Sequence, residues 1–277
     1  MIKSLTALRG VFILFIFFHH CLDIYPGGGS MAVTFFFVLG GFSMTLGYKD
    51  KVCMPDFCYR QYLTKRCIKF FPLHWICLLA VLPLTGFPFG LRKGLFFVAN
   101  AGLMQTLLPI KDLYFSFNSV SWYLADTLFF AVLFPCVLRF IISASLRNRF
   151  IFLTSAIVFY LLVSFVLPQR DYHAFLYICP YLRLVDFIIG IYLALLFICI
   201  RPKSFKISLL WDGTTGLVLL FVLIIMLVAE SCFLGKGIRL IAAFYWPLVA
   251  LIILMASICD SSGGGQIIGK QIYAKIG

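Results

Sequence analysis

The chain has 277 residues, of which 63% are hydrophobic and only 12% are charged, and its formal net charge is +13. In soluble globular domains about 25% of residues are charged, and a soluble fold of this length has too little interior to bury so much apolar surface. The composition excludes an ordinary soluble protein. In a membrane protein, an excess of basic residues is typical of the segments that flank the spans, rather than of a nucleic-acid-binding surface.

Apolar stretches of a length that crosses a bilayer follow one another along the chain. The backbone must satisfy its own hydrogen bonds inside lipid, so continuous apolar runs predict helices, whereas a barrel would show short alternating strands. We therefore expect an all-α, polytopic transmembrane helical bundle that forms a single membrane domain over residues 1–277. The nine candidate spans are residues 6–22, 31–48, 68–85, 94–109, 121–142, 150–168, 181–200, 208–229 and 238–258.

The distribution of lysine and arginine predicts the orientation of this bundle. Six basic residues lie in the 49–69 loop, and none lies in the 22–31 loop. Because cytoplasmic loops carry the basic excess, we expect the amino terminus and the 49–69 loop to be cytoplasmic. The short candidate span 94–109 contains polar residues, and the charge asymmetry is larger if it does not cross. Both arrangements of this segment stay open.

The first candidate span carries the first group of residues with possible chemistry. Arg9 and His20 are eleven residues apart, which is about 20° from a whole number of helical turns, so they share one face. His19 points about 80° away from Arg9, and Asp23 is within reach of either histidine. A histidine near a carboxylate is a plausible general base. The alternative is that Arg9 marks the cytoplasmic interface and His20 is a hydrogen-bonded histidine within the bundle.

Two features follow in the second and third spans. Gly40 and Gly41 are small enough to allow a close helix approach or a local break. Further on, Arg66 and Lys69 lie one helical turn apart in a basic stretch. Such a pair could bind the phosphates of an acyl carrier, and the alternative is a positive-inside membrane anchor.

Later spans contain ionisable residues within apolar runs, which are costly in a membrane and so indicate function. Asp126 lies four residues after Trp122, and Arg183 and Asp186 lie one turn apart. For the second pair, an intrahelical ion pair is the alternative. The ten cysteines are scattered without a CxxC pair, so they predict neither a disulfide framework nor a zinc site, and we expect no metal.

In chain order, these segments resemble acyltransferase family 3, the bacterial multi-span O-acyltransferases. LRG at residues 8–10 precedes His20 with the family's ten-residue gap between arginine and histidine, and FFVLGGF at residues 36–42 is similar to the family's FFVLSGF. A basic stretch closed by Pro72 follows. The later elements are matched by Ser121, Trp122 and Asp126 (a loose match to WSLSVE) and by Pro180, Arg183, Asp186, Phe187 and Gly190.

The chain departs from the family pattern at several positions. Gly40 replaces the usual serine, and Asp126 and Asp186 stand where glutamate is usual. Near the end, Gly269, Lys270 and Tyr273 resemble the start of a GKISYSLYLxH-like element that enters the last of the family's usual ten spans. We therefore expect the chain to lack that last C-terminal span.

The resemblance implies a multi-pass enzyme of the cytoplasmic (inner) membrane that moves an acyl group, often acetyl, from acyl-CoA to a hydroxyl of a surface or lipid-linked carbohydrate. Acyl-CoA is a donor substrate, and no cofactor is expected. Two other hypotheses stay open: a non-enzymatic transporter or flippase of lipid-linked sugars, and an inactive fragment. The implied catalytic residues are His20, as base or acyl relay, and Arg9; the implied substrate-binding residues are Arg66, Lys69, Trp122, Asp126, Arg183 and Asp186.

Overall fold

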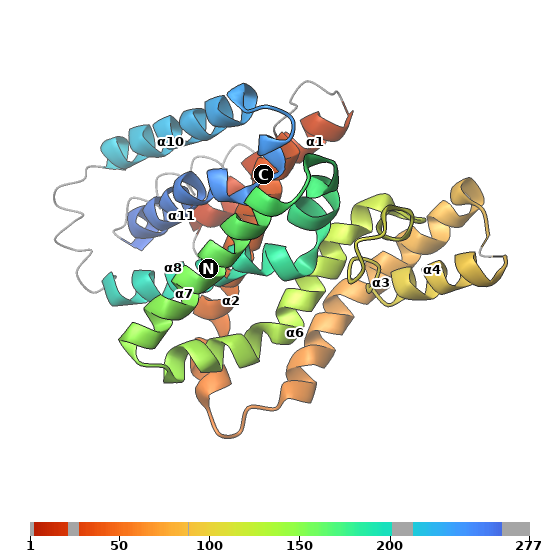
Figure 1. The fold of residues 1–277 in the computed structure, drawn as a ribbon. Helices are drawn as coiled ribbons and strands as arrows, with labels where there is room; N and C mark the ends of the chain where they lie inside the picture. Colours follow the sequence, from red (N-terminus) through yellow and green to blue (C-terminus); the bar gives the residue numbers. More distant parts are fainter. Residues whose placement is uncertain (1–2, 22–27, 88, 201–212, 262–277) are drawn as a thin grey trace, which may run out of the picture. The chain divides into compact units, whose positions relative to one another are not determined.

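The computed structural model of the protein describes most of the chain, and within the described ranges the regular elements are helices (Figure 1). Six of them, α1, α2, α3, α6, α7 and α8, are long and apolar enough to cross a membrane, and α10 and α11 contain shorter apolar stretches. The prediction of an all-α polytopic membrane bundle is therefore confirmed. The described ranges are residues 3–21, 28–87, 89–200 and 213–261.

The bounds of the helices agree with most of the expected spans. The α-helices are α1 (Lys3–Cys21), α2 (Gly28–Cys53), α3 (Tyr59–Thr85), α4 (Leu91–Ala101), α5 (Lys111–Tyr114), α6 (Trp122–Ser143), α7 (Leu146–Val166), α8 (Pro180–Ile200), α10 (Gly213–Phe233) and α11 (Trp246–Ser261). The short 3₁₀ or π elements are η1 (Ser119–Ser121), η2 (Gln169–Asp171), η3 (His173–Ile178), η5 (Ile238–Leu240) and η6 (Ala242–Phe244).

The chain divides into two compact units. The terminal unit comprises residues 1–46 and 186–277, and the central unit comprises residues 47–185. Helix α8 therefore contributes its first residues to the central unit and the rest to the terminal unit. A single domain over residues 1–277 and a missing last span stay predictions, and Gly269, Lys270 and Tyr273 lie outside the described residues.

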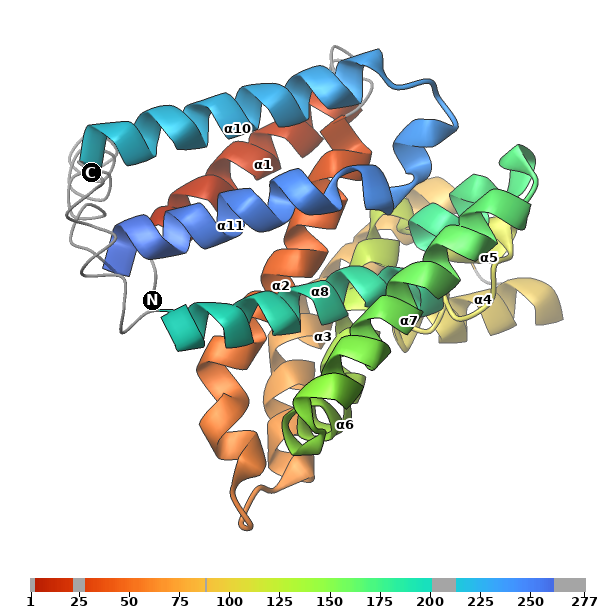
Figure 2. The ribbon, with the colours of Figure 1, turned by 60° about the vertical axis from the view of Figure 1, so that its left-hand side comes forward.

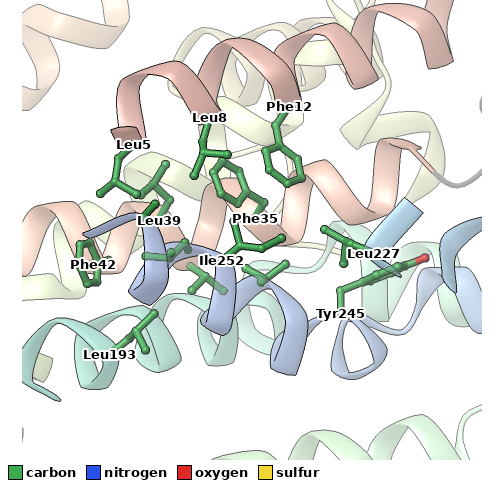
Figure 3. Close-up of a cluster of buried hydrophobic side chains, with 14 of the residues drawn as sticks. Leu5, Leu8, Phe12, Phe35, Leu39, Phe42, Leu193, Leu227, Tyr245 and Ile252 are labelled. Atoms are coloured by element: carbon green, nitrogen blue, oxygen red, sulfur yellow. The ribbon is translucent and has the colours of Figure 1, made fainter. Parts of the chain in front are cut away.

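The core of the terminal unit is built from apolar faces of five helices, as Figure 3 shows. Leu5, Leu8 and Phe12 are buried and are spaced three and four residues apart, so they form one stripe along α1. The ring of Phe12 stacks on that of Phe35 in α2, with the centroids 3.7 Å apart. Helix α10 runs beside α11, which also packs against α1 (Figure 2).

Two glycines allow α2 and α8 to cross with their backbones in contact. A Cβ atom on Gly41 would overlap the carbonyl oxygen of Phe187, and a Cβ atom on Gly190 would overlap that of Val38. Lipid tails are as apolar as the helices, so the hydrophobic effect does little to bring helices together within a membrane. Close backbone approach at small residues is therefore a main source of helix association. Of the two possibilities for the Gly40 and Gly41 segment, close approach and a local break, the structure shows close approach, and it occurs at Gly41.

We expect Gly41→Ala to destabilise the protein by about 3 kcal/mol, because the added methyl group must push two backbones apart. Gly40→Ala is the matched control: its Cβ would lie 3.7 Å from the ring of Phe187, an ordinary contact. Alanine also favours the helix by about 0.5–1 kcal/mol over glycine. Thermal unfolding in detergent should show a lowered midpoint for Gly41→Ala alone, and equal midpoints for both variants would contradict the crossing.

In the central unit, α3 packs along α6. Side chains of α3 also replace a hydrogen bond that a proline inside α6 removes. Pro135 lies inside α6 and has no N–H group to donate to the carbonyl of Ala131. The hydroxyl of Tyr62 donates to that carbonyl instead, at 2.8 Å, and the hydroxyl of Tyr59 donates to the carbonyl of Val132 at 2.7 Å. Helix α6 therefore keeps its carbonyl groups satisfied through side chains of α3.

The candidate span at residues 94–109 does not form a long helix. Helix α4 has 11 residues, which corresponds to about 16 Å, about half of the hydrocarbon thickness of a bilayer. The chain then turns at Gly102 and Leu103, where Leu103 has a φ of 54°. Asn100 holds this end of α4: its side chain donates to the Ser116 hydroxyl, and its carbonyl accepts from His74 Nε2 at 2.8 Å. The structure therefore favours the arrangement in which this segment does not cross.

Candidate functional site

The two histidines of α1 lie in different environments. Seven residues separate Phe12 from His19, so at 100° per residue His19 lies within about 20° of the buried stripe of α1. Its half-buried ring lies against Gly29 of α2, where an added Cβ would come within 2.9 Å of it. His20 lies about 80° from Phe12 and is exposed. The ring of His20 is therefore the more accessible of the two from outside the helix packing.

Arg9 connects α1 to α2, and it lies on the side of α1 that carries His20. Its guanidinium is half-buried and donates a hydrogen bond of 2.9 Å to the hydroxyl of Ser43, directly after the FFVLGGF segment. This bond holds the side chain of Arg9 on the flank of α1 that His20 shares. The carboxylate of Asp23, which the sequence places within reach of the histidines, lies outside the described residues.

Two buried ionisable side chains, one on α6 and one on α8, lie near each other within the central unit. The side chains of Asp126 and Arg183 are 0% and 1% exposed, and the two groups interact electrostatically. Thr106, which is also buried, approaches the carboxylate of Asp126. The sequence offered Asp186 as the ion-pair partner of Arg183 because it lies one turn away on the same helix. The structure adds a second buried ionisable group near Arg183, the carboxyl group of Asp126, which lies 57 positions earlier in the chain.

A group of aromatic rings lies near Arg183. The indole of Trp122 lies 5.0 Å from the ring of Tyr177, and the ring of His173 lies 5.2 Å from Tyr177 on another side. Burial raises the pKa of Tyr177 to about 12, an effect that the positive charge of Arg183 opposes. Burial and the nearby charge of Lys111 lower the pKa of His173, so its imidazole is neutral at pH 7. The group therefore offers a buried carboxylate, a cation and neutral hydrogen-bonding rings.

Asp186 has its own partner in the terminal unit. The indole Nε1 of Trp246, the first residue of α11, donates a hydrogen bond to Oδ1 of Asp186. Both side chains are buried. The bond ties the start of α11 to α8, so Asp186 has a structural contact besides the substrate-binding role that the sequence predicted for it.

The two cations that the sequence predicts to bind phosphate differ in their burial and in their contacts with other side chains. Arg66 is half-buried, and its guanidinium stacks over the rings of Tyr48 and Tyr62, at 4.8 and 5.3 Å from the ring centroids. Lys69 is exposed one turn further along α3. The two tyrosine rings therefore hold a planar cation in place one helical turn before an exposed one.

Several residues of these groups were not predicted from the sequence. They are Thr106, His173 and Tyr177 near Asp126 and Arg183, together with Trp246 and Ser43 in the terminal unit. The one sequence signal for His173 would have been its position between two apolar runs. Its segment forms a π-helix, a form that occurs frequently at functional sites, but no local pattern announces it. Among the described residues, no three His, Cys, Asp or Glu side chains are grouped so that they could hold a metal ion.

Comparison with known proteins finds similarity to acyltransferases. The sequence profile of a family described as "Acyltransferase domain" matches residues 2–265. The chain is also 27% identical over 187 residues to "Acyltransferase MdmB" of Streptomyces mycarofaciens, which covers 61% of this chain and 46% of that protein. The chain thus matches less than half the length of this relative. No solved structure matches it significantly.

Proposed function

The chain belongs to the acyltransferase domain family, and from this premise we propose that it is a membrane enzyme that moves an acyl group, in particular acetyl, from acyl-CoA to a hydroxyl of a cell-surface or lipid-linked carbohydrate. The observation that carries the proposal is the family match, which extends over residues 2–265 and so includes both units. The resemblance of the motifs around Arg9, His20 and Arg183 supports it.

In the proposed reaction His20 accepts the proton of the acceptor hydroxyl, whose oxygen attacks the thioester carbonyl. A carbon–oxygen bond forms, the carbon–sulfur bond breaks, and the proton passes to the departing thiolate of coenzyme A. In the alternative use of His20, the acyl group passes through its imidazole before it reaches the hydroxyl. Arg9 supports His20 from the same flank of α1, where Ser43 holds its guanidinium.

We place the enzyme in the cytoplasmic membrane with its amino terminus inside. The donor phosphates then bind to Arg66 and Lys69 at the cytoplasmic end of α3, and His20 lies toward the other end of α1. The acyl group of the donor must therefore reach into the bundle. The stacking of Arg66 on two tyrosines supports a built phosphate site there, because a simple membrane anchor needs no such clamp.

We expect membranes that contain the protein to release coenzyme A from acetyl-CoA only when a carbohydrate acceptor extracted from the cell envelope is added. Lys69→Ala should raise the apparent KM for acetyl-CoA about tenfold, the loss typical of one hydrogen bond to a charged group. Lys69 is exposed, so its loss should not affect folding. The release of coenzyme A is measured with a thiol reagent.

The matched control is Arg147→Ala, which removes an exposed positive charge at the start of α7, on the same predicted side of the membrane. Its KM should equal that of the unmodified protein. If coenzyme A is not released, while lipid-linked sugars still cross membranes in a protein-dependent manner, the transporter hypothesis replaces this one. An unchanged KM in Lys69→Ala would return this residue to the role of a membrane anchor.

A further inference from the structure

A cavity of about 380 Å³ lies within the central unit, where the end of α3, the start of α4 and the segment around α5 meet. Its volume is in the range of sites that bind small molecules, about 300–1,000 Å³. None of the residues that line it belongs to the motifs of the proposed acyl-transfer site. They are Thr85, Arg92, Lys93, Phe96, Asp112, Ser116 and Phe117.

The charges of this cavity are unbalanced in favour of cations. Arg92 forms an ion pair of 2.7 Å with Asp112, and the two side chains are 72% and 68% exposed. Lys93 forms no salt bridge with any residue that the structure describes, and the first turn of α4 contains no acidic residue. Positive side chains at a helix amino terminus are unfavourable because the helix dipole is positive there. A bound anion would relieve this repulsion.

The walls of the cavity are aromatic and fixed. The guanidinium of Arg92 lies over the ring of Phe96, at 5.3 Å from the ring centroid. Phe117 has a φ of 55°, in the left-handed region that non-glycine residues rarely adopt, and its ring meets that of Phe97 edge to face. Strained backbone of this kind costs about 1–3 kcal/mol and occurs preferentially at binding sites.

A hydrogen-bond network holds the part of the wall that Ser116 forms. The hydroxyl of Ser116 accepts a hydrogen bond of 2.6 Å from Asn100 and donates to the carbonyl of Leu113. Asn100 is completely buried and is itself held by His74 of α3. The position of Ser116, and with it the adjacent Phe117, is therefore determined by hydrogen bonds within the protein rather than by solvent.

The cavity is separate from the phosphate site predicted for the donor. Lys69 and Thr85 are sixteen residues apart on α3, which corresponds to about 24 Å along a regular helix. With the amino terminus in the cytoplasm and α4 not crossing, the end of α3 faces the opposite side of the membrane from Lys69. An anion that binds here thus comes from the side on which surface carbohydrates are found.

We propose that this cavity binds a phosphate-bearing carbohydrate, with the phosphate on Lys93 and Arg92 and the sugar ring against Phe96 and Phe117. The free oxygen of Asp112 accepts a hydrogen bond from a sugar hydroxyl. Aromatic faces, one carboxylate and a pair of cations suit a sugar phosphate better than an inorganic ion, which would use the cations alone. The proposal rests on the proposed function in that it names the class of the acyl acceptor.

The test is equilibrium dialysis of radiolabelled glucose 1-phosphate against the purified full chain in an uncharged detergent. The unmodified protein should bind glucose 1-phosphate more tightly than inorganic phosphate. Lys93→Gln should weaken the binding at least about tenfold, as expected for the loss of a hydrogen bond to a charged group. The control Arg170→Gln removes another exposed charge on the same predicted side, outside the cavity, and should bind as the unmodified protein does.

Equal binding by Lys93→Gln and the unmodified protein would overturn the proposal. Phosphatidylglycerol vesicles provide the second arm: if they compete better than unlabelled glucose 1-phosphate, the cavity is a contact for lipid headgroups and the carbohydrate assignment is wrong. Release of coenzyme A is measured on the same samples. If glucose 1-phosphate binds in a Lys93-dependent manner but coenzyme A is not released, the cavity is a carbohydrate site and the proposed acyl transfer is wrong. If coenzyme A is released but glucose 1-phosphate does not bind in this manner, acyl transfer stands and the carbohydrate site is wrong.

Discussion

His20→Ala should reduce the rate of acyl transfer by about a hundred- to ten-thousand-fold, the usual contribution of a general base. His20 is exposed, so its replacement removes little packing, and the amount of protein in the membrane should stay normal. The measurement is the rate of coenzyme A release at saturating acetyl-CoA, corrected for the abundance of each variant. A rate near that of the unmodified protein would reject His20 as base or relay.

His19→Ala is the matched control, because it removes the same side chain from the adjacent position. The ring of His19 lies against Gly29, so this variant should lose stability rather than chemistry. Its activity per folded molecule should fall much less than that of His20→Ala. A greater loss in His19→Ala would exchange the roles of the two histidines.

Arg183→Met should destabilise the protein by about 1–3 kcal/mol, because it removes the cation that lies near the buried carboxyl group of Asp126 and leaves that polar group without it. Both side chains are almost completely buried, so water cannot replace the lost interaction. Methionine keeps most of the volume of the arginine stem, which limits the contribution of a cavity. The measurement is the midpoint of thermal unfolding in detergent, followed by circular dichroism.

The double variant Asp126→Asn/Arg183→Met distinguishes loss of the charge pair from loss of packing. If the carboxylate and the guanidinium stabilise each other, the double variant should be more stable than Arg183→Met alone, because no uncompensated charge remains. Additive losses from the two substitutions would show that the side chains do not act as a pair. Arg147→Met, at an exposed position, should leave the midpoint unchanged.

The helices, and the predicted side of the membrane on which they begin, follow from properties that are local in the sequence. Apolar length alone predicts helices in lipid, and the expected spans therefore coincide closely with α1, α2, α6 and α7. Helical rotation likewise puts Arg9 and His20 on one face without reference to another segment. The membrane restricts the backbone so strongly that few other local structures are available.

The short length of α4 was only partly predictable. Asn100 and Gln105 made the segment unusually polar for a span, but polarity alone is compatible with a crossing helix that packs inside a bundle. Its end is decided by hydrogen bonds to other segments, through the carbonyl of Asn100 to His74 and through its side chain to Ser116. These partners lie 26 and 16 residues away, beyond the range of any helical period.

The sequence by itself determined that the chain is an all-helical membrane protein, and its ordered motifs determined the family that it resembles. Only the tertiary structure decided the partners of the buried polar groups. Local spacing places Arg183 beside Asp186, and only the fold adds Asp126 near Arg183 and the indole of Trp246 as a partner of Asp186. The physical reason is that a buried charge takes the partner that best replaces its lost hydration. That partner is selected by how helices pack, which no spacing within a single helix contains.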